Sequence, residues 1–518
     1  MPWSGDASRT TNNLITVSLA ILKSRAQLGV TAPPVTIEVF LGGGLPTFSV
    51  VGLPEAAVRE SKDRVRSAIS SCNFGFPEGR ITVSLGPADM RKTGGRFDLP
   101  IALGILAAKD VVPTGRFESF EFYGELSLNG DIRSVPGVLP AAIKAADAGH
   151  PIVVPKDNGA EASLIPGEVY VANTLLEVTA FLKGVGELEA AEPPSEPVCL
   201  NQVADLADVK GQRLAKRALE VAAAGRHNIL FSGPPGTGKS MLAQRLPGIL
   251  PPMNDVEAIE TAAVDSVLGR SFDLARWRQR PFRAPHHTAS AVALVGGGSD
   301  PRPGEISRAH NGVLFLDELP EFSRHVLEVL REPMESGWIT ISRAGRQADY
   351  PARFQLVAAM NPCPCGYLGD PAGDCRCSAE RVQNYRGKIS GPLLDRIDIH
   401  MPVQRPPMES LRPGAPAEEA SAEVSKRVID ARTIQLDRSG VCNAELSGDD
   451  LKNAFRADDE SWALLDKAAD KLAMSARAYQ RVQRVARTIA DLAAEESVHK
   501  HHMAEALALR QFDRQAGI

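Results

Sequence analysis

The chain has 518 residues, of which 43% are hydrophobic and 23% charged, and its 63 acidic residues against 58 basic ones give a net charge of −5. This composition excludes intrinsically disordered and collagen-like chains, and the acidic balance excludes a polycation that coats nucleic acid, so any DNA contact must come from local basic patches. The apolar runs fall short of the roughly 18 residues that a membrane span needs. We therefore predict a cytoplasmic protein that contacts no membrane, with about three domains for a chain of this length.

The first block, residues 18–185, alternates short β-type runs with helical stretches and predicts an α/β domain. Its expected strands include Val35–Leu41, Phe48–Val51, Ile81–Leu85 and Ile152–Val154, and its expected helices include Glu55–Ser70, Leu99–Ala108 and Leu139–Ala148. Residues 186–200, acidic and rich in proline, predict a linker.

A second α/β block covers residues 201–403 and carries most of the motifs. Residues 404–418 are again rich in proline and predict a connector. Residues 419–518 are expected to be helical, because segments such as Ser461–Leu472 and Tyr479–Ala494 space their apolar residues at three and four.

A phosphate-binding loop follows the apolar strand that ends at Ser232, and a helical stretch comes directly after it. Glycines let such a loop wrap a phosphate chain with its N–H groups pointing inward, and the helix N-terminus adds a positive dipole. In this pattern the lysine reaches the β- and γ-phosphates and the serine hydroxyl binds Mg²⁺. The predicted nucleotide-binding residues are Gly233, Pro234, Pro235, Gly236, Thr237, Gly238, Lys239, Ser240 and Met241.

Two further apolar strands end in polar residues. Val313–Leu316 leads into Asp317 and Glu318, and Gln355–Met360 leads into Asn361. In a P-loop ATPase the first acid holds Mg²⁺, the second polarises the attacking water, and a polar amide at a strand tip contacts the γ-phosphate or that water. Without the P-loop, these residues would be interpreted as a solvated strand end and a turn asparagine.

The residues at these strand ends, together with Gly391–Asp398, are specific enough to indicate a resemblance to one protein family. The second block resembles the AAA+ ATPases of the magnesium-chelatase/MCM-like group, and nearly the whole chain from about Val17 resembles the ComM/YifB family of magnesium-chelatase-like proteins. The stretches that carry this resemblance include PFRAPHHTAS, LFLDELPEF, ARFQLVAAMNPCPCG and SARAYQRVQRVARTIADL.

The resemblance implies a homohexameric ring that binds ATP and Mg²⁺ between subunits. It implies a motor for branch migration or unwinding of DNA, which helps to integrate single-stranded DNA during natural transformation and works alongside recombination proteins. Arg396 then takes the place of the arginine finger that enters the neighbouring site. Arg477 matches the sensor-2 arginine, with Arg481 as second choice; by sequence alone each would be an ordinary surface ion-pair partner.

Four of the seven cysteines crowd into a short segment, Cys363, Cys365, Cys375 and Cys377. Four thiolates at this spacing can close a tetrahedral site that suits Zn²⁺ and leaves no open position, so its role would be structural. The alternatives are two disulfides or four free thiols. A reducing compartment disfavours disulfides, and four free surface thiols would be prone to oxidation.

The residues Trp338–Ser342 and Gln347–Phe354 predict a β-hairpin with Arg343 and Arg346 at its tip. The MCM-like group has such a hairpin in the pore of its ring, and Arg343 matches its DNA-contacting position. The basic segment Arg270–Arg283 falls where that group carries an inserted hairpin. Ion pairs within the chain are the alternative for all these arginines, and the following His286 and His287 are interpreted as loop or core histidines.

The first block resembles the Lon-protease-like domain of ribosomal S5 type. Lon-type proteolysis needs a serine nucleophile and a lysine base, whereas the matching positions here hold Asp98 and Leu139. We therefore expect a domain that binds DNA or forms the ring, with Arg91, Lys92 and Arg96 either facing nucleic acid or in a solvated basic loop. Residues 1–17 precede the point where family members begin, and are either a disordered extension or the result of a misplaced start codon.

The overall expectation is an α/β P-loop AAA+ module between a Lon-like domain and a C-terminal helical domain. Three other functions stay open. A magnesium-chelatase-like ATPase would remodel a protein partner, and its activity would respond to protein instead of DNA. An ATP-dependent protease is disfavoured by Asp98 and Leu139, and a nucleotide-gated DNA clamp would tolerate the loss of Glu318.

Overall fold

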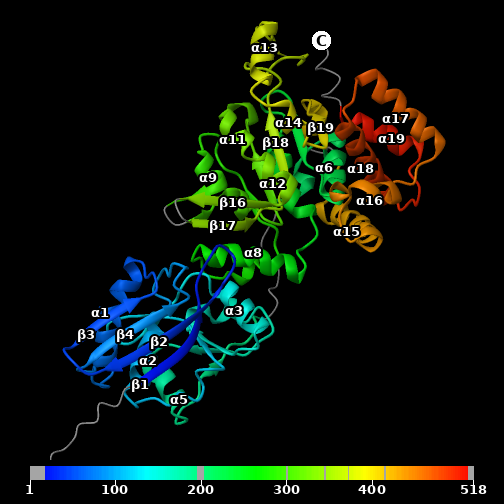
Figure 1. The fold of residues 1–518 in the computed structure, drawn as a ribbon. Coiled ribbons are helices and arrows are strands. Elements are labelled where there is room, and N and C mark those ends of the chain that lie inside the picture. The colour runs from blue at the N-terminus through cyan, green and yellow to red at the C-terminus, as the bar shows by residue number, and fades with distance from the viewer. Residues whose placement is uncertain are drawn as a thin grey trace, which may run out of the picture. The chain divides into compact units, whose positions relative to one another are not determined.

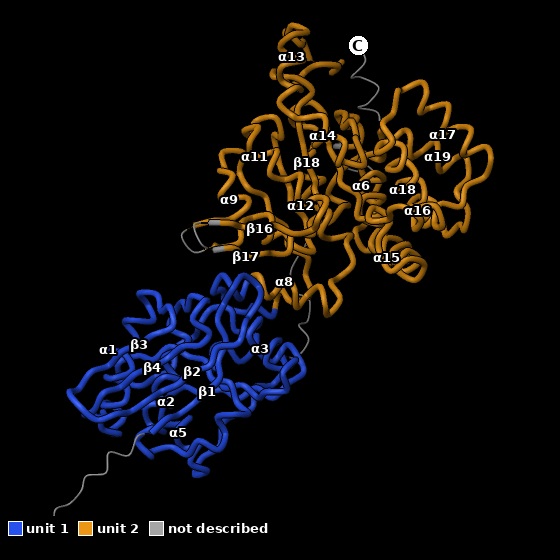
Figure 2. Tube along the Cα trace, in the orientation of Figure 1, with its two compact units in different colours: residues 1–196, 265–274 blue, residues 197–264, 275–518 orange. Residues whose placement is uncertain are grey.

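The computed structural model describes residues 18–194, 204–298, 301–343, 346–371, 373–412 and 416–510. These residues form two compact units (Figure 1, Figure 2). Unit 1 comprises residues 1–196 and 265–274, and unit 2 comprises residues 197–264 and 275–518. The predicted N-terminal extension, residues 1–17, lies outside the described residues.

Unit 1 is built on a mixed eight-stranded sheet in the order β10-β9-β8-β5-β1-β2-β4-β3. Its strands are β1 (Ser18–Arg25), β2 (Pro34–Gly42), β3 (Thr47–Val51), β4 (Arg80–Gly86), β5 (Glu121–Phe122), β8 (Ile152–Pro155), β9 (Val169–Ala172) and β10 (Glu189–Ala190), with the separate hairpin β6 (Glu125–Leu126) and β7 (Ile132–Arg133). Its helices are α1 (Ala56–Ser71), α2 (Asp98–Ala108), α3 (Val138–Asp147), α4 (Gly159–Ala162) and α5 (Leu175–Leu182).

The helix α2 is buried along its whole length and packs on β1 and β2. Gly104 permits this close approach, because a Cβ at that position would lie 2.4 Å from Cγ2 of Val39. The strands and helices expected for this block are confirmed within one or two residues. The structure differs from the predicted linker at β10, whose two residues pair antiparallel with β9 and extend the sheet.

The core of unit 2 is a parallel five-stranded sheet in the order β12-β15-β18-β11-β19. The strands are β11 (Ile229–Ser232), β12 (Phe282–Arg283), β15 (Val313–Leu316), β18 (Gln355–Met360) and β19 (Ile399–Pro402). Buried apolar runs of this kind are typical of parallel sheets that are covered on both faces. Because the strands are parallel, the residues that follow them meet at one edge of the sheet.

Helices and two hairpins surround this sheet. The helices are α6 (Arg213–Gly225), α7 (Lys239–Arg245), α8 (Asp255–Val267), α9 (Ala291–Val295), α10 (Glu305–Arg308), α11 (Arg324–Glu328), α12 (Arg331–Ser336), α13 (Ala379–Arg386) and α14 (Gly391–Leu394). The hairpins pair β13 (Gly296–Gly297) with β14 (Arg302–Pro303) and β16 (Trp338–Arg343) with β17 (Arg346–Pro351).

The C-terminal part of unit 2 is helical, as predicted, and lies beside α6 (Figure 1). It contains α15 (Ser421–Ser439), α16 (Gly448–Ala454), α17 (Asp459–Leu472), α18 (Ala476–Leu492) and α19 (Lys500–Ala508). Its apolar residues share one hydrophobic cluster with α6 and the sheet, and the buried Arg432 donates from Nη2 to the carbonyl oxygen of Ala223 at 2.7 Å. Within the described residues, no helix is long and apolar enough to cross a membrane.

Candidate nucleotide-binding site

The predicted P-loop connects the interior strand β11 to α7. Gly236 and Gly238 have φ angles of +75° and +88°, a backbone region that glycine enters without the steric cost of a Cβ. Gly233 is needed for another reason: a Cβ there would lie 2.1 Å from the carbonyl oxygen of Val403. The side chain of Thr237 closes the loop by donating to the carbonyl oxygen of Pro234 at 3.0 Å.

Lys239 is the first residue of α7, and its ammonium group is buried against the loop. Its Nζ donates to the carbonyl oxygens of Gly233 at 2.7 Å and Pro234 at 2.9 Å, and to Oδ1 of Asn361 at 3.2 Å. These three acceptors match the three donors of an ammonium group, and phosphate oxygens would compete for the same protons. Burial lowers the pKa of Lys239, against the opposing effect of the nearby acidic pair.

The acidic pair follows β15, two strands away from the P-loop. Oγ of Ser240 donates to Oδ2 of Asp317 at 2.6 Å, so the two predicted Mg²⁺ ligands already lie together. Glu318 adopts a left-handed backbone with φ of +52°, which is uncommon outside glycine and recurs at functional sites. Its carboxylate lies 3.0 Å from Nδ1 of His287.

His287 was interpreted from sequence as a loop or core histidine, so its contact with Glu318 was missed. The motif PFRAPHHTAS, which carries this histidine, was the available signal, but nothing in its spacing identifies Glu318 as a neighbour. Lys239, Ser240, Asp317 and Asn361 were all assigned to this site from sequence, and the structure brings them together.

The sulfur atoms of the four clustered cysteines lie together in the segment that follows Asn361. The Sγ atoms lie 3.3 Å apart for Cys363 and Cys365, 3.8 Å for Cys363 and Cys375, and 3.6 Å for Cys365 and Cys375, with Cys377 completing the group. Sulfurs around a tetrahedral zinc at about 2.3 Å would be about 3.8 Å apart. A disulfide would need about 2.05 Å, so this donor set fits a tetrahedral metal better than a disulfide pair.

The four thiols influence one another's titration. The N–H of Tyr367 and the neighbouring Cys363 lower the pKa of the Cys365 thiol to about 6. Against the opposing effect of the N–H of Cys377, burial and the hydrogen bond with Cys365 raise the pKa of the Cys375 thiol to about 11. Metals bind the thiolate form. Cys363 is buried and the other three are partly exposed. The cluster can therefore hold a metal ion with four protein ligands.

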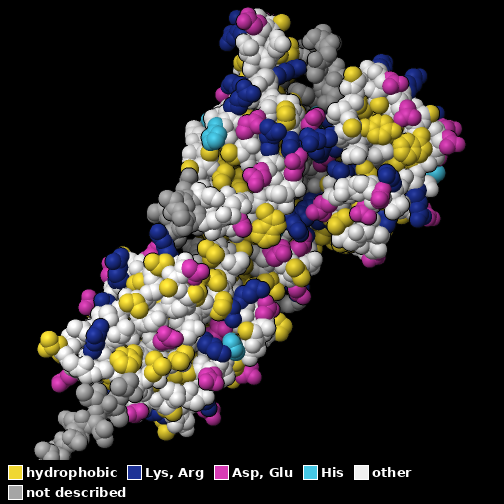
Figure 3. All heavy atoms as spheres, in the orientation of Figure 1, with side chains coloured by type: hydrophobic (Ala, Val, Ile, Leu, Met, Phe, Trp, Pro, Cys, Tyr) yellow, Lys and Arg dark blue, Asp and Glu magenta, His cyan; other side chains and the backbone are white. Residues whose placement is uncertain are grey.

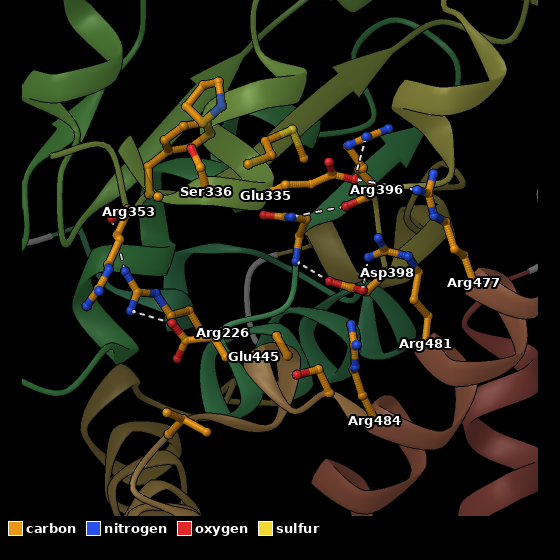
Figure 4. Close-up of a pocket in the computed structure, with 18 of the residues that line it drawn as sticks. Arg226, Glu335, Ser336, Arg353, Arg396, Asp398, Glu445, Arg477, Arg481 and Arg484 are labelled. Atoms are coloured by element: carbon orange, nitrogen blue, oxygen red, sulfur yellow. Dashed lines mark hydrogen bonds and ion pairs between the residues drawn. The ribbon is translucent and has the colours of Figure 1, made fainter. Parts of the chain in front are cut away.

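The arginine-finger candidate and the sensor-2 candidates lie elsewhere, in a pocket of about 590 Å³ (Figure 4). This pocket includes Asn228, at the end of β11 opposite the P-loop. The amide nitrogen of the Asn228 side chain, just before β11, donates to the carbonyl oxygen of Arg396 at 3.1 Å. The guanidinium of Arg396 contacts the carboxylate of Glu335 and donates to the carbonyl oxygen of Pro392 at 2.6 Å. Its side chain is only 6% exposed.

Arginines outnumber carboxylates two to one in the lining of this pocket. The arginines are Arg226, Arg353, Arg396, Arg477, Arg481 and Arg484, and the carboxylates are Glu335, Asp398 and Glu445. Arg477 is 60% exposed and lies 3.9 Å from Glu335. Arg481 is held by an ion pair of 2.5 Å with the buried Asp398. Arg477 is therefore the more available of the two sensor-2 candidates.

The predicted β-hairpin is confirmed, because β16 pairs antiparallel with β17 and Arg343 lies opposite Arg346. Its contact with DNA stays a prediction. The basic segment Arg270–Arg283 differs from the expected inserted hairpin, because β12 joins the core sheet parallel to β15. Its arginines also make ion pairs, among them Arg280 with Glu257 at 2.8 Å. The face of unit 2 in Figure 3 carries basic and acidic side chains interspersed, without a continuous basic field.

Two of the three basic residues considered for unit 1 are buried, contrary to both sequence interpretations. Nζ of Lys92 donates to the carbonyl oxygen of Met90 at 2.8 Å, and Nη2 of Arg96 donates to Oε1 of Gln27 at 2.8 Å. Backbone carbonyls and an amide satisfy these charged groups, so neither faces solvent or nucleic acid within unit 1. Arg91 remains exposed.

A parallel sheet in which an interior strand enters a G-x-x-x-x-G-K-S loop, with an asparagine and an acidic pair at the next two strand ends, defines a P-loop ATPase of the AAA+ class. Three family descriptions match: "Magnesium chelatase, subunit ChlI" over residues 205–411, "Subunit ChlI of Mg-chelatase" over residues 37–158 and "Magnesium chelatase, subunit ChlI C-terminal" over residues 418–510.

The chain is 50% identical over 503 residues to the competence protein ComM of Haemophilus influenzae, with 96% of this chain and 98% of that protein covered. It is 48% identical to YifB of Salmonella typhimurium and 46% identical to YifB of Escherichia coli, with the same coverage. The chain belongs to the ComM/YifB family of magnesium-chelatase-like AAA+ proteins. Family membership indicates ATP and Mg²⁺ as the ligands of the site.

Proposed function

We propose that the chain is an ATP-driven DNA motor that works as a homohexameric ring in branch migration or unwinding. One observation carries the proposal: the P-loop and the pocket that holds Arg396 lie at opposite ends of β11. Gly233 at the P-loop lies five positions after Asn228, which is beside Arg396, and five positions correspond to about 16 Å of extended strand. An arginine at that end cannot reach a nucleotide on its own P-loop, so a neighbouring copy completes the site.

Within one site, each side chain has a definite task. Lys239 and the P-loop N–H groups bind the phosphates, and Ser240 and Asp317 hold Mg²⁺. Glu318 accepts the proton of the attacking water, which Asn361 orients. When bound, Mg²⁺ neutralises charge on the β- and γ-phosphates.

The arginines complete the site from the adjacent copy. Arg396 leaves Glu335 to neutralise the charge that develops on the γ-phosphate, and the exposed Arg477 adds a second positive charge there. Both side chains come from one pocket, so a single docking movement between copies delivers them together.

In this proposal the motor moves along DNA. Arg343 and Arg346 lie at the tip of a two-stranded hairpin, and basic tips that contact the phosphate backbone give sequence-independent, salt-sensitive binding. The relative named competence protein ComM supports a role in integrating single-stranded DNA during natural transformation, alongside recombination proteins.

Two other parts of the chain serve structural roles in this proposal. The four cysteines hold Zn²⁺, because their sulfur spacing suits a tetrahedral ion and leaves no open position for a substrate. Unit 1 acts as a Lon-like module without proteolysis. At the positions of the missing dyad, Asp98 accepts from Nε of Arg64 at 2.6 Å and Leu139 is fully buried.

A magnesium-chelatase-like ATPase that remodels a protein partner is the second candidate, because all three matching family descriptions name the chelatase subunit. The two functions differ in what stimulates hydrolysis. The deciding experiment measures the ATPase rate with no DNA, single-stranded DNA and forked DNA for the wild type, Lys239→Ala and Glu318→Gln. If DNA stimulates the ATPase rate and both variants abolish this stimulation, the DNA motor is supported. If no DNA changes the rate, the protein-remodelling function becomes the better explanation.

The shared site has its own test. Lys239→Ala and Arg396→Ala should each be inactive alone, but a mixture should regain ATPase activity, because an intact P-loop of one variant meets an intact Arg396 of the other. A mixture without activity, under conditions where the two variants assemble together, would contradict a site built from two copies.

A further inference from the structure

The segment with the four cysteines contacts the P-loop directly. Gly366, in the turn between Cys365 and Cys375, has a φ angle of +86°, and a Cβ on it would lie 2.7 Å from Cδ of Pro235. Carbon atoms in contact are normally about 3.5–4.0 Å apart, so not even a methyl group fits between this turn and the P-loop. Cδ of Pro235 belongs to a rigid ring, and it cannot yield as the end of a flexible side chain would.

A second connection runs from the same segment to the sensor asparagine. The N–H of Gly366 donates to the carbonyl oxygen of Cys363 at 3.0 Å, which fixes the turn on the first cysteine. Nε of Arg386, at the end of α13, donates to the carbonyl oxygen of Pro362 at 3.1 Å. Pro362 directly follows Asn361, which accepts from Lys239.

The position of the turn therefore depends on the sulfur cluster, and the position of the P-loop depends on the turn. The loop between Cys365 and Cys375 reads GYLGDPAGD, with Tyr367 and Leu368 as its large apolar side chains. Leu368 is 37% exposed, so apolar packing holds the loop only in part, whereas four metal–sulfur bonds would fix both of its ends. Removing the ion would leave four thiols, three of them packed at 3.3–3.8 Å, with only weak S–H hydrogen bonds between them.

We propose that the metal centre formed by Cys363, Cys365, Cys375 and Cys377 is a positioning element of the nucleotide site, which acts through Gly366 on Pro235 and through Pro362 on Asn361. Zinc occupancy then sets the affinity for ATP. This inference rests on the proposed nucleotide site and adds to it a dependence on a bound metal.

The chain offers a matched pair of variants for the test. Gly366 and Gly369 lie in the same turn, with φ angles of +86° and +77°, but a Cβ at Gly369 would meet nothing within 4 Å. An alanine at either position carries the same backbone cost of about 1 kcal/mol, so only the contact with Pro235 differs between them.

The experiment measures two quantities on the full chain, the zinc content by metal analysis and the dissociation constant of a fluorescent ATP analogue. Gly366→Ala should keep its zinc but bind the analogue about tenfold more weakly, because a shift of about 1 Å in a binding loop has effects of this size or larger. Gly369→Ala should match the wild type in both. Chelation of zinc from the wild type should weaken binding similarly, and added Zn²⁺ should restore it.

Lys239→Ala separates this inference from the proposed function. If Lys239→Ala abolishes analogue binding while the zinc-free protein and Gly366→Ala bind like the wild type, the positioning role is overturned and the nucleotide site stands. A purified wild type that takes up no zinc would overturn the metal centre itself. A wild type that binds no nucleotide in the presence of zinc would overturn the nucleotide site first.

Discussion

The carboxylate of Glu335 contacts the guanidinium of Arg396, and its same oxygen lies 3.9 Å from Nη2 of Arg477. Glu335 belongs to α12, which ends at Ser336 and leads through Gly337 into the hairpin strand β16. One carboxylate thus holds both arginines proposed for the neighbouring site, and it lies a single turn before the hairpin proposed to contact DNA. A movement of the hairpin would reach the arginines through this residue.

We predict that Glu335→Gln raises the ATPase rate in the absence of DNA and lowers the factor by which DNA stimulates it. The carboxylate competes with phosphate for Arg396, and an amide competes far less because charged hydrogen bonds are about twice as strong as neutral ones. Steady-state ATPase rates with and without single-stranded DNA check this. Glu332→Gln on the same helix is the control, since Glu332 is also exposed but is not among the residues that line the arginine pocket. An unchanged stimulation factor in Glu335→Gln would remove Glu335 from the coupling.

Asp398 anchors the other side of the arginine pocket. It is 2% exposed, accepts from the backbone N–H of Asn228 at 3.0 Å and pairs with Arg481. Burial acts to raise its pKa, but the charge of Arg481 and the nearby His227 outweigh burial and hold the pKa of Asp398 well below its usual range. The ionised carboxylate therefore stabilises the start of β11 and the first residues of α18.

Because the pKa of Asp398 is lower in the folded chain than in the unfolded chain, its contribution to stability is present above the unfolded value of about 3.9 and is lost as the pH falls towards the folded value. We predict that Asp398→Asn lowers the free energy of unfolding by about 3 kcal/mol at pH 7, the cost of breaking a buried ion pair. The difference between variant and wild type should shrink below pH 4, as chemical denaturation over a pH series would show. A difference independent of pH would contradict the role of the charge.

The sequence predicted well those parts of the site that lie at strand ends. A buried apolar run followed by a polar residue locates a strand tip, and parallel strands bring their tips together, so the group of Lys239, Ser240, Asp317 and Asn361 followed from local patterns. The two halves of the cysteine cluster were also predictable, because ligands close in sequence need only one loop between them.

Relationships that depend on tertiary packing were beyond sequence reasoning. Lys92 and Arg96 look like a solvated basic loop, yet backbone carbonyls satisfy them inside unit 1, and no local pattern encodes such partners. The contact of Glu335 with Arg396 joins residues 61 positions apart through the placement of α12. The strand β12 could not be predicted either, because it consists of only two residues, which become a strand by pairing with β15.

Gly233 offers a final test of how tightly the P-loop is fitted to the sheet. A Cβ there would overlap the carbonyl oxygen of Val403, whose own N–H donates to the carbonyl oxygen of Ser232 at 2.7 Å, so neither backbone can yield without breaking the pairing of β11 with β19. We predict that Gly233→Ala lowers the free energy of unfolding by about 3 kcal/mol and weakens nucleotide binding.

Gly391→Ala is the matched control for this variant. Gly391 opens α14, and a Cβ on it would meet nothing within 4 Å. Alanine should leave stability unchanged or raise it by up to about 1 kcal/mol, because it restricts the unfolded chain. Thermal unfolding with and without ATP measures both effects, and equal stabilities for the two variants would show that the P-loop has room to move where the geometry leaves none.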